Sequence, residues 1–289
     1  MKISKDSLIT LTLFLILTIV FYIIGYWLIY RIGKATPLML SVGVAAILTC
    51  LIRKRSLSTL GWGWGNWKYA WMSYLIPLAL IAMAYLIIWI FGFGQWYDTA
   101  FVAEQKANYN LSHWNDFSII LFHLVLTATI SFIILLPSVL AEEIAWRGFL
   151  VPELSKFMNF TNVALFSGLL WAIWHWPLMI KGLYGNDVTP LLFQLVCFTV
   201  FIMSSSMIMT YLRYKTKSVW TAVIYHMSSN VFLQKFFTPV TLEIPNSSWY
   251  LDEFGLVLAL VVLIAAMYYW KKGSKEFGNR NLLIAENSD

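Results

Sequence analysis

Eight apolar runs, separated by short polar or basic stretches, constrain the fold of this chain more than any other feature. The runs are residues 8–30, 37–52, 69–93, 117–141, 161–180, 190–212, 219–237 and 254–270. A transmembrane α-helix needs about 20 predominantly apolar residues, and most of these runs approach that length. We therefore predict an all-α fold, a polytopic transmembrane helical bundle of about eight spans. Seven spans are the alternative, because residues 37–52 form a short run for a bilayer crossing.

The composition supports this class of protein. Of the 289 residues, 60% are hydrophobic and only 12% are charged, which is about half the charged fraction of a soluble domain. In such a chain the net charge of +6 mostly reports basic loops at the membrane surface. We expect the lipid bilayer as a partner and no nucleic acid. The first run is too long for a signal-peptide core, so we expect it to be retained.

The distribution of lysine and arginine predicts the orientation of the bundle. Eight spans place both termini on one side of the membrane. With the N-terminus inside, cytoplasmic segments hold all of the 20 basic residues except Arg31, Lys34, Lys106, Lys181 and Lys235. Cytoplasmic loops of membrane proteins carry an excess of basic residues. We therefore predict that the N-terminus and the C-terminus both lie inside.

Charged residues follow the fourth apolar run directly, within residues 141–152. Charge at the edge of a bilayer-length segment is costly unless it is paired or functional. Glu143 and Arg147 are four residues apart, so on a helix they share a face and can form an ion pair. Glu142 points about 100° away from Glu143, so its carboxylate can stay free for chemistry. The simpler interpretation is a charged helix cap at the membrane surface.

Two histidines and an asparagine lie inside later apolar runs. His175 follows Trp174 in the fifth run, and His226 and Asn230 are four residues apart in the seventh, so they share a helix face. Taken singly, each side chain could simply bond neighbouring helices together. One free carboxylate, two histidines and an amide on three separate runs are more typical of a functional site.

The chemistry that suits these side chains is the activation of water. A carboxylate can take a proton from a water molecule that attacks a carbonyl carbon, with a histidine orienting that water. A second histidine and an amide can donate hydrogen bonds to the developing oxyanion. Glu142, His175 and His226 are also a formal zinc ligand set with an open position. The residues alone leave both arrangements open.

Three ordered motifs carry a resemblance to a known family. They are Glu142-Glu143-x-x-x-Arg147, an aromatic-x-x-x-His from Trp171 to His175, and His226-x-x-x-Asn230. In this order they resemble the CPBP family, the CAAX prenyl endopeptidases and bacterial bacteriocin-processing or immunity membrane proteins. The resemblance covers about residues 131–237. The second motif usually begins with phenylalanine, and Trp171 keeps the aromatic character.

The resemblance implies a role for each motif residue. For Glu142 and His175 it implies a general-base or metal-ligand role, and for His226 and Asn230 an oxyanion or metal-ligand role. The supporting residues of the first motif are Glu143 and Arg147. The family is commonly called metalloprotease-like, yet the same side chains have also been interpreted as a metal-free site. Zinc is therefore one cofactor hypothesis, and a metal-free mechanism is the other.

The resemblance further implies an intramembrane endopeptidase that cuts a peptide or membrane-protein substrate, in a bacterial cell membrane. The alternative is a non-catalytic CPBP-like protein for bacteriocin immunity or scaffolding. A proton-relaying transporter is disfavoured, because no inverted repeat is visible. We divide the chain into N-terminal transmembrane helices with an extracytoplasmic loop (1–116), catalytic core helices (117–237), and a last helix with a cytoplasmic tail (238–289).

The depths of the candidate residues conflict with these span boundaries. Glu142 lies about 37 Å along an ideal helix from residue 117. His175 is late in its run, whereas His226 is near the middle of its own. Straight helices with these boundaries would not bring the three side chains level, so a bend at Pro137 or an earlier start of the fifth run is expected.

Overall fold

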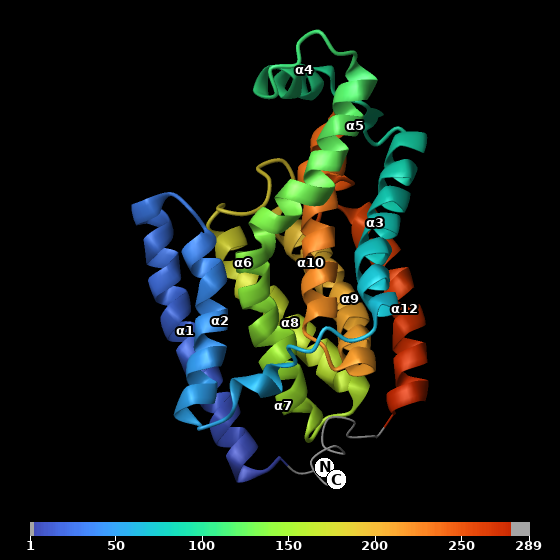
Figure 1. Ribbon diagram of the computed structural model, residues 1–289. Coiled ribbons are helices and arrows are strands. Elements are labelled where there is room, and N and C mark those ends of the chain that lie inside the picture. Colours follow the sequence, from blue (N-terminus) through green and yellow to red (C-terminus); the bar gives the residue numbers. More distant parts are fainter. Residues whose placement is uncertain (1–2, 279–289) are drawn as a thin grey trace.

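The structure is a computed structural model that describes residues 3–278, and its regular structure is almost entirely helical (Figure 1). Six helical segments in this part of the chain are long and apolar enough to cross a membrane: α1 (Lys5–Ile32), α3 (Trp67–Ile90), Asp116–Ser155, α8 (Phe160–Ile180), α9 (Leu191–Thr216) and α12 (Leu256–Phe277). The shorter apolar helix α2 (Thr36–Ile52) and the 13-residue helix α10 (Trp220–Phe232) complete the bundle. The all-α polytopic bundle predicted from the apolar runs is confirmed.

Polar caps explain why the helices begin close to the predicted positions. The side-chain oxygens of Asn66, Asn115 and Asn159 accept backbone N–H groups at the starts of α3, α5 (Asp116–Leu126) and α8. Such a cap satisfies one of the four N–H groups that the first turn of a helix leaves without a partner. The caps therefore start these helices within two residues of the predicted boundaries.

The helix that carries the two glutamates differs most from its predicted boundaries. It runs without a break from Asp116 to Ser155 through α5, η2 (Thr127–Ser131), α6 (Phe132–Glu143), η3 (Ile144–Leu150) and α7 (Val151–Ser155). Forty residues extend for about 60 Å, twice the hydrocarbon thickness of a bilayer. Figure 1 shows α5 rising beyond its neighbours toward α4 (Thr99–Asn108). The predicted end of this helix at residue 141 was wrong.

The extension of α5 beyond the bundle resolves the conflict between the expected depths of Glu142, His175 and His226. Because the helix begins far outside the bundle and continues past residue 141, Glu142 lies well inside it. Glu142 is 4% exposed and Glu143 is 0% exposed. Contrary to the simpler interpretation, these residues do not cap the helix, because it continues to Ser155. The segment η3 that follows them is π-helical, a local widening of the helix that is frequent at functional sites.

Close helix contacts set the positions of the helices around this point. A Cβ atom added to Gly43 of α2 would lie 2.6–2.8 Å from Ala141 of α6, the residue just before Glu142. A Cβ atom added to Gly168 of α8 would lie 2.9 Å from the Cβ of Ser206 in α9. Small residues at such crossings allow transmembrane helices to approach closely. The glycines thus bring α2 against α6 and α8 against α9, the helices around the candidate site.

The two ends of the bundle differ in structure. At one end, β1 (Gln95–Trp96) pairs with β2 (Thr241–Leu242) as a minimal antiparallel ladder, with α4 nearby. The start of α1 and the end of α12 lie at the other end (Figure 1), as an even number of spans requires. Helix α12 continues seven residues past the predicted 270, and Lys215 pairs with Glu276 near its end at 2.6 Å. The rest of the predicted tail, residues 279–289, lies outside the described residues.

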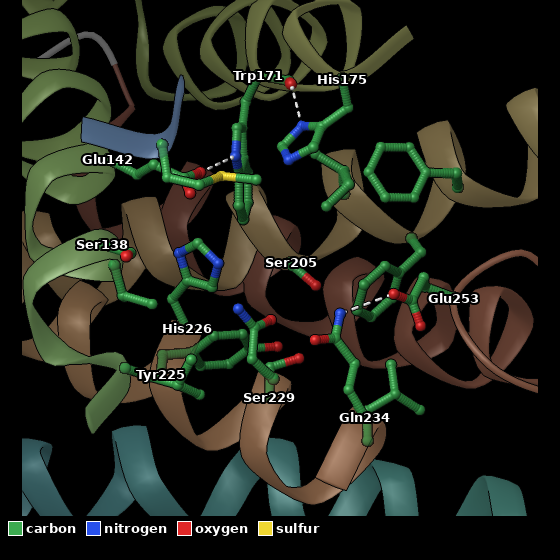
Figure 2. Close-up of a pocket in the computed structure, with 18 of the residues that line it drawn as sticks. Ser138, Glu142, Trp171, His175, Ser205, Tyr225, His226, Ser229, Gln234 and Glu253 are labelled. Atoms are coloured by element: carbon green, nitrogen blue, oxygen red, sulfur yellow. Dashed lines mark hydrogen bonds between the residues drawn. The ribbon is translucent and has the colours of Figure 1, made fainter. Parts of the chain in front are cut away.

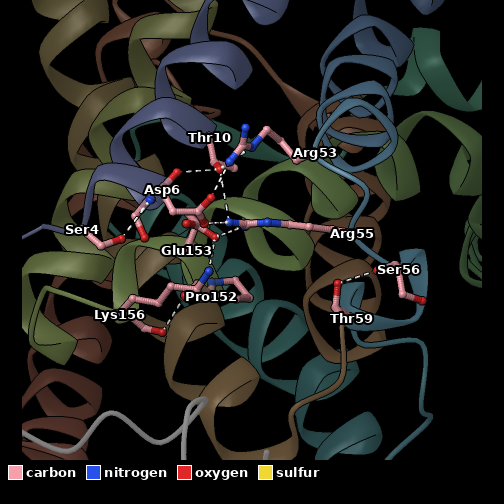
Figure 3. A network of polar contacts seen from close by, with 12 residues as sticks. Ser4, Asp6, Thr10, Arg53, Arg55, Ser56, Thr59, Pro152, Glu153 and Lys156 are labelled. Atoms are coloured by element: carbon pink, nitrogen blue, oxygen red, sulfur yellow. Dashed lines mark hydrogen bonds and ion pairs between the residues drawn. The ribbon is translucent and has the colours of Figure 1, made fainter.

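An ion-pair network joins three segments at this second end (Figure 3). Arg53, just after α2, pairs with Asp6 of α1. Arg55 binds Asp6 at 2.8 Å and Glu153 of α7 at 2.5 Å, and Lys156 binds Glu153 at 2.6 Å. The basic stretch that predicted a cytoplasmic loop therefore also fastens α1 and α2 to α7.

Candidate active site

One cavity of about 280 Å³ brings together the four side chains for which the sequence predicts chemistry (Figure 2). Its walls come from α2, α6, α8, α9 and α10. Its lining includes Glu142, His175, His226 and Asn230. The volume is large compared with the roughly 30 Å³ that one water molecule occupies in the liquid. Water and part of a substrate can therefore share this space.

Of the two adjacent glutamates, Glu142 is the one without an ion pair within residues 3–278. The indole N–H of Trp171 in α8 donates to its Oε2 at 3.0 Å. No cation within residues 3–278 pairs with this side chain, and its Oε1 receives no hydrogen bond there. One oxygen of Glu142 is thus fixed by Trp171, and the other is free to bind a water molecule in the cavity.

Glu143 forms the centre of a buried charged network. The Nη1 atom of Arg147 lies 3.0 and 3.1 Å from its two oxygens, so the ion pair expected from the spacing is present. Nδ1 of His226 lies 2.9 Å from Oε1 of the same carboxylate, a contact that the sequence did not predict. Arg147 is always charged, so Glu143 is an ionised acceptor and Nδ1 of His226 carries the proton. The Nε2 atom of His226 is the one left for chemistry.

His175 is held in a defined tautomer by its own helix. Its Nδ1 lies 3.0 Å from the backbone carbonyl oxygen of Trp171, which can only accept, so Nδ1 donates. The rings of Trp174 and Phe198 pack against the imidazole at centroid distances of 4.8 and 5.2 Å. In the neutral ring Nε2 then carries a lone pair, which suits it to accept a hydrogen bond from water.

Trp171 is the functional candidate that the sequence interpretation undervalued. Its N–H binds Glu142, and the Arg147 guanidinium carbon lies 4.3 Å from the ring centroid, a cation–π contact. Its ring also packs on His226, with centroids 5.0 Å apart. Tryptophan in place of the usual phenylalanine keeps the aromatic ring, but the N–H donor that it adds is the more informative difference. Phenylalanine at this position could not bind the carboxylate.

The arrangement of donor atoms in the cavity bears on the zinc hypothesis. Within residues 3–278, no group of three or more His, Cys, Asp or Glu side chains is arranged to hold a metal ion. Both Nδ1 atoms are engaged, that of His226 by Glu143 and that of His175 by a backbone carbonyl, which leaves the Nε2 atoms as the nitrogens that could bind a metal ion. Among the described residues, however, Glu142, His175 and His226 are not arranged as a zinc site in this geometry.

The comparisons with known proteins agree with the motifs. Residues 117–232 match the family model described as type II CAAX prenyl endopeptidase Rce1-like. The chain is also similar to CAAX prenyl protease 2 of Methanococcus maripaludis, with 24% identity over 169 residues, 57% of this chain and 56% of that protein. The chain thus spans about half the length of this curated relative. These matches support the CPBP family predicted from the three motifs, and the matched segment contains every residue of those motifs.

Proposed function

We propose that this protein is an intramembrane endopeptidase in which Glu142 activates a water molecule. The observation that carries the proposal is a buried carboxylate without a cation partner, opening into the cavity that His175, His226 and Asn230 also line. An ionisable group inside a membrane protein is expensive to keep without a function. The substrate is a peptide segment or a membrane protein whose chain enters this cavity.

The first step is the attack of water on the peptide carbonyl. Oε1 of Glu142 accepts the proton of a water molecule, and Nε2 of His175 accepts a second hydrogen bond from it. The water oxygen then bonds to the carbonyl carbon, and the electron pair of the C=O bond moves onto its oxygen. General-base catalysis of this type contributes typically 10²–10⁴-fold to a rate.

The second step requires donors for the oxyanion and a proton for the leaving amine. The Asn230 amide can donate to the oxyanion directly. His226 donates through Nε2 only as an imidazolium ion. When the C–N bond breaks, the amine takes the proton held by Glu142, which regenerates the carboxylate. No step uses a metal ion.

Cleavage by the purified protein tests this proposal against the non-catalytic alternative. The full chain in detergent or liposomes is incubated with a peptide library, with and without a chelator, and products are identified by mass spectrometry. Wild type should cleave a subset of peptides equally well with the chelator, and Glu142→Gln should lose at least 10²-fold in kcat while remaining monodisperse. Equal turnover by wild type and Glu142→Gln would reject the proposal, and a phenotype that survives Glu142→Gln would favour immunity or scaffolding.

A further inference from the structure

A second buried carboxylate lines the candidate site across the cavity from Glu142. Glu253 lies just before α12 and is 4% exposed. The Tyr184 hydroxyl and the Gln234 amide both donate to its Oε1, at 2.7 and 2.8 Å. Figure 2 shows Glu253 and Glu142 on opposite sides, with Ser205 between them. Because both donors use Oε1, Oε2 receives no hydrogen bond from the described residues.

Charge compensation distinguishes the four buried glutamates of residues 3–278. Glu143 is paired with Arg147, and Glu153 with Arg55 and Lys156. Glu142 and Glu253 have no cation partner in the described chain, and both line this cavity. The lining, as far as the structure describes it, contains neither lysine nor arginine. Buried charges in proteins are normally paired, so two unpaired carboxylates make the cavity attractive to a cation.

Glu253 lies next to a second acidic residue in the sequence, Asp252. Asp252 precedes Glu253 outside the membrane-spanning helices, and burial together with the nearby Glu253 and Glu243 carboxylates raises its pKa above the usual range. A raised pKa favours the neutral form of Asp252, so the carboxylate that would attract a cation here is Glu253. Of the three, Glu253 is the one that reaches the cavity wall.

We propose that Glu253, with Gln234 and Tyr184, forms a subsite that binds a cationic group of the substrate, a lysine or arginine side chain or a free N-terminal ammonium. This inference rests on the proposed function, because it assigns the substrate class of the same cavity. Donation by Tyr184 and Gln234 to Oε1 fixes the carboxylate and leaves Oε2 for the incoming cation. The substrate would then be held with its charged group at Glu253 and its scissile carbonyl toward Glu142.

A purely structural role for Glu253 predicts something different. The carboxylate joins the loop after α8, the segment η4 (Leu233–Phe237) and the start of α12. These structural hydrogen bonds need an acceptor oxygen at Oε1, but they do not need a negative charge. Glu253→Gln keeps an acceptor oxygen and nearly the same volume while it removes the charge. Glu243→Gln is the matched control, because Glu243 is an exposed carboxylate that does not line the cavity.

Binding measured without turnover tests the subsite directly. In a Glu142→Gln background, fluorescent peptides that differ only by lysine, arginine or norleucine at one position, with free or acetylated N-termini, are titrated into the full chain. The cationic peptides should bind roughly 10–100-fold more tightly than the neutral ones, as expected for a hydrogen bond to a charged group. Adding Glu253→Gln should abolish the difference, whereas Glu243→Gln should preserve it. If norleucine weakens binding, the cation is a side chain, and if acetylation weakens binding, it is the N-terminal ammonium.

The two proposals can fail separately. Equal affinity for cationic and neutral peptides, or a preference that survives Glu253→Gln in monodisperse protein, would overturn the subsite. If wild type cleaves peptides without any preference for a basic group, the endopeptidase proposal stands and the subsite falls. If no peptide is cleaved but binding depends on charge and on Glu253, the subsite stands and the endopeptidase proposal falls.

Discussion

The long helical segment Asp116–Ser155 carries two charged networks that differ in their exposure to solvent. The inner network joins Glu143, Arg147 and His226 next to the cavity, and both members of its ion pair are 0% exposed. The outer network joins Arg55 and Glu153 to Asp6, which is 61% exposed. An exposed ion pair contributes about 0–1 kcal/mol, whereas removing one partner of a buried pair costs about 3–5 kcal/mol. Similar side chains thus link neighbouring segments in the outer network, whereas in the inner network they neutralise a buried charge.

The inner network also ends at an imidazole, which the outer one does not. Glu143 fixes the tautomer of His226 and thereby determines which nitrogen faces the cavity. Removing Glu143 would therefore affect folding and chemistry together. Removing Arg53 or Asp6, the more exposed pair of the outer network, should affect neither strongly, and this contrast can be tested one residue at a time.

The largest effect is expected for Glu143→Ala. It leaves the fully buried Arg147 without a counter-ion, so stability should fall by about 3–5 kcal/mol, with a low monodisperse yield. Thermal unfolding in detergent measures the loss. The double variant Glu143→Ala with Arg147→Met removes both charges and should recover much of the stability but not the activity, because His226 still lacks its acceptor. A stable Glu143→Ala protein with full turnover would remove the distinction between the two networks.

A smaller effect, confined to catalysis, is expected for Asn230→Ala. Its amide cannot act as a base at neutral pH, so a role in chemistry has to be hydrogen-bond donation to the oxyanion. Losing one such donor costs about 2.7–4 kcal/mol of transition-state stabilisation, so kcat should fall about 10²–10³-fold, with KM nearly unchanged. Steady-state kinetics of Asn230→Ala and Asn230→Asp make the comparison. A near-normal kcat for Asn230→Asp would exclude the oxyanion role, because a carboxylate would repel the developing charge.

Trp171→Phe tests the single donor on Glu142 and should have an intermediate effect. Phenylalanine keeps the aromatic packing against Arg147 and His226 but lacks the N–H that binds Oε2. A hydrogen bond to a charged group contributes about 1.5–3 kcal/mol, so kcat should fall roughly 10–100-fold. Unfolding temperature serves as the control and should change little. An unchanged kcat would mean that Trp171 only fills space beside the carboxylate.

The sequence predicted those parts of the molecule that depend on local patterns. Apolar runs predicted the helices, and a spacing of four predicted that Glu143 and Arg147 share a helix face. Contacts between distant segments were not predictable in this way. Glu143 and His226 are 83 residues apart, and nothing in the spacing within either helix indicates that they meet.

Two further features were missed for identifiable physical reasons. The depth of Glu142 depends on how far α5 extends beyond the bundle, and an apolar run gives no sign that its helix starts outside the bundle. Glu253 precedes an apolar run, as many interfacial acids do, and its burial depends on Tyr184 and Gln234 from two other segments. In both cases tertiary packing, rather than local sequence, decides the environment of the carboxylate.

The smallest effect is expected for Arg53→Gln in the outer network. Arg53 pairs with Asp6, and their side chains are 28% and 61% exposed, so solvent and salt screen the pair. The free energy of unfolding should fall by less than about 1 kcal/mol, with kcat and KM unchanged, and the difference from wild type should shrink as salt is raised. Thermal unfolding at low and high ionic strength measures this. Arg55 also binds Asp6 and would keep α1 fastened to α7 in the variant. A loss as large as that of Glu143→Ala would show that exposure does not separate the two networks, and the comparison between them would fail.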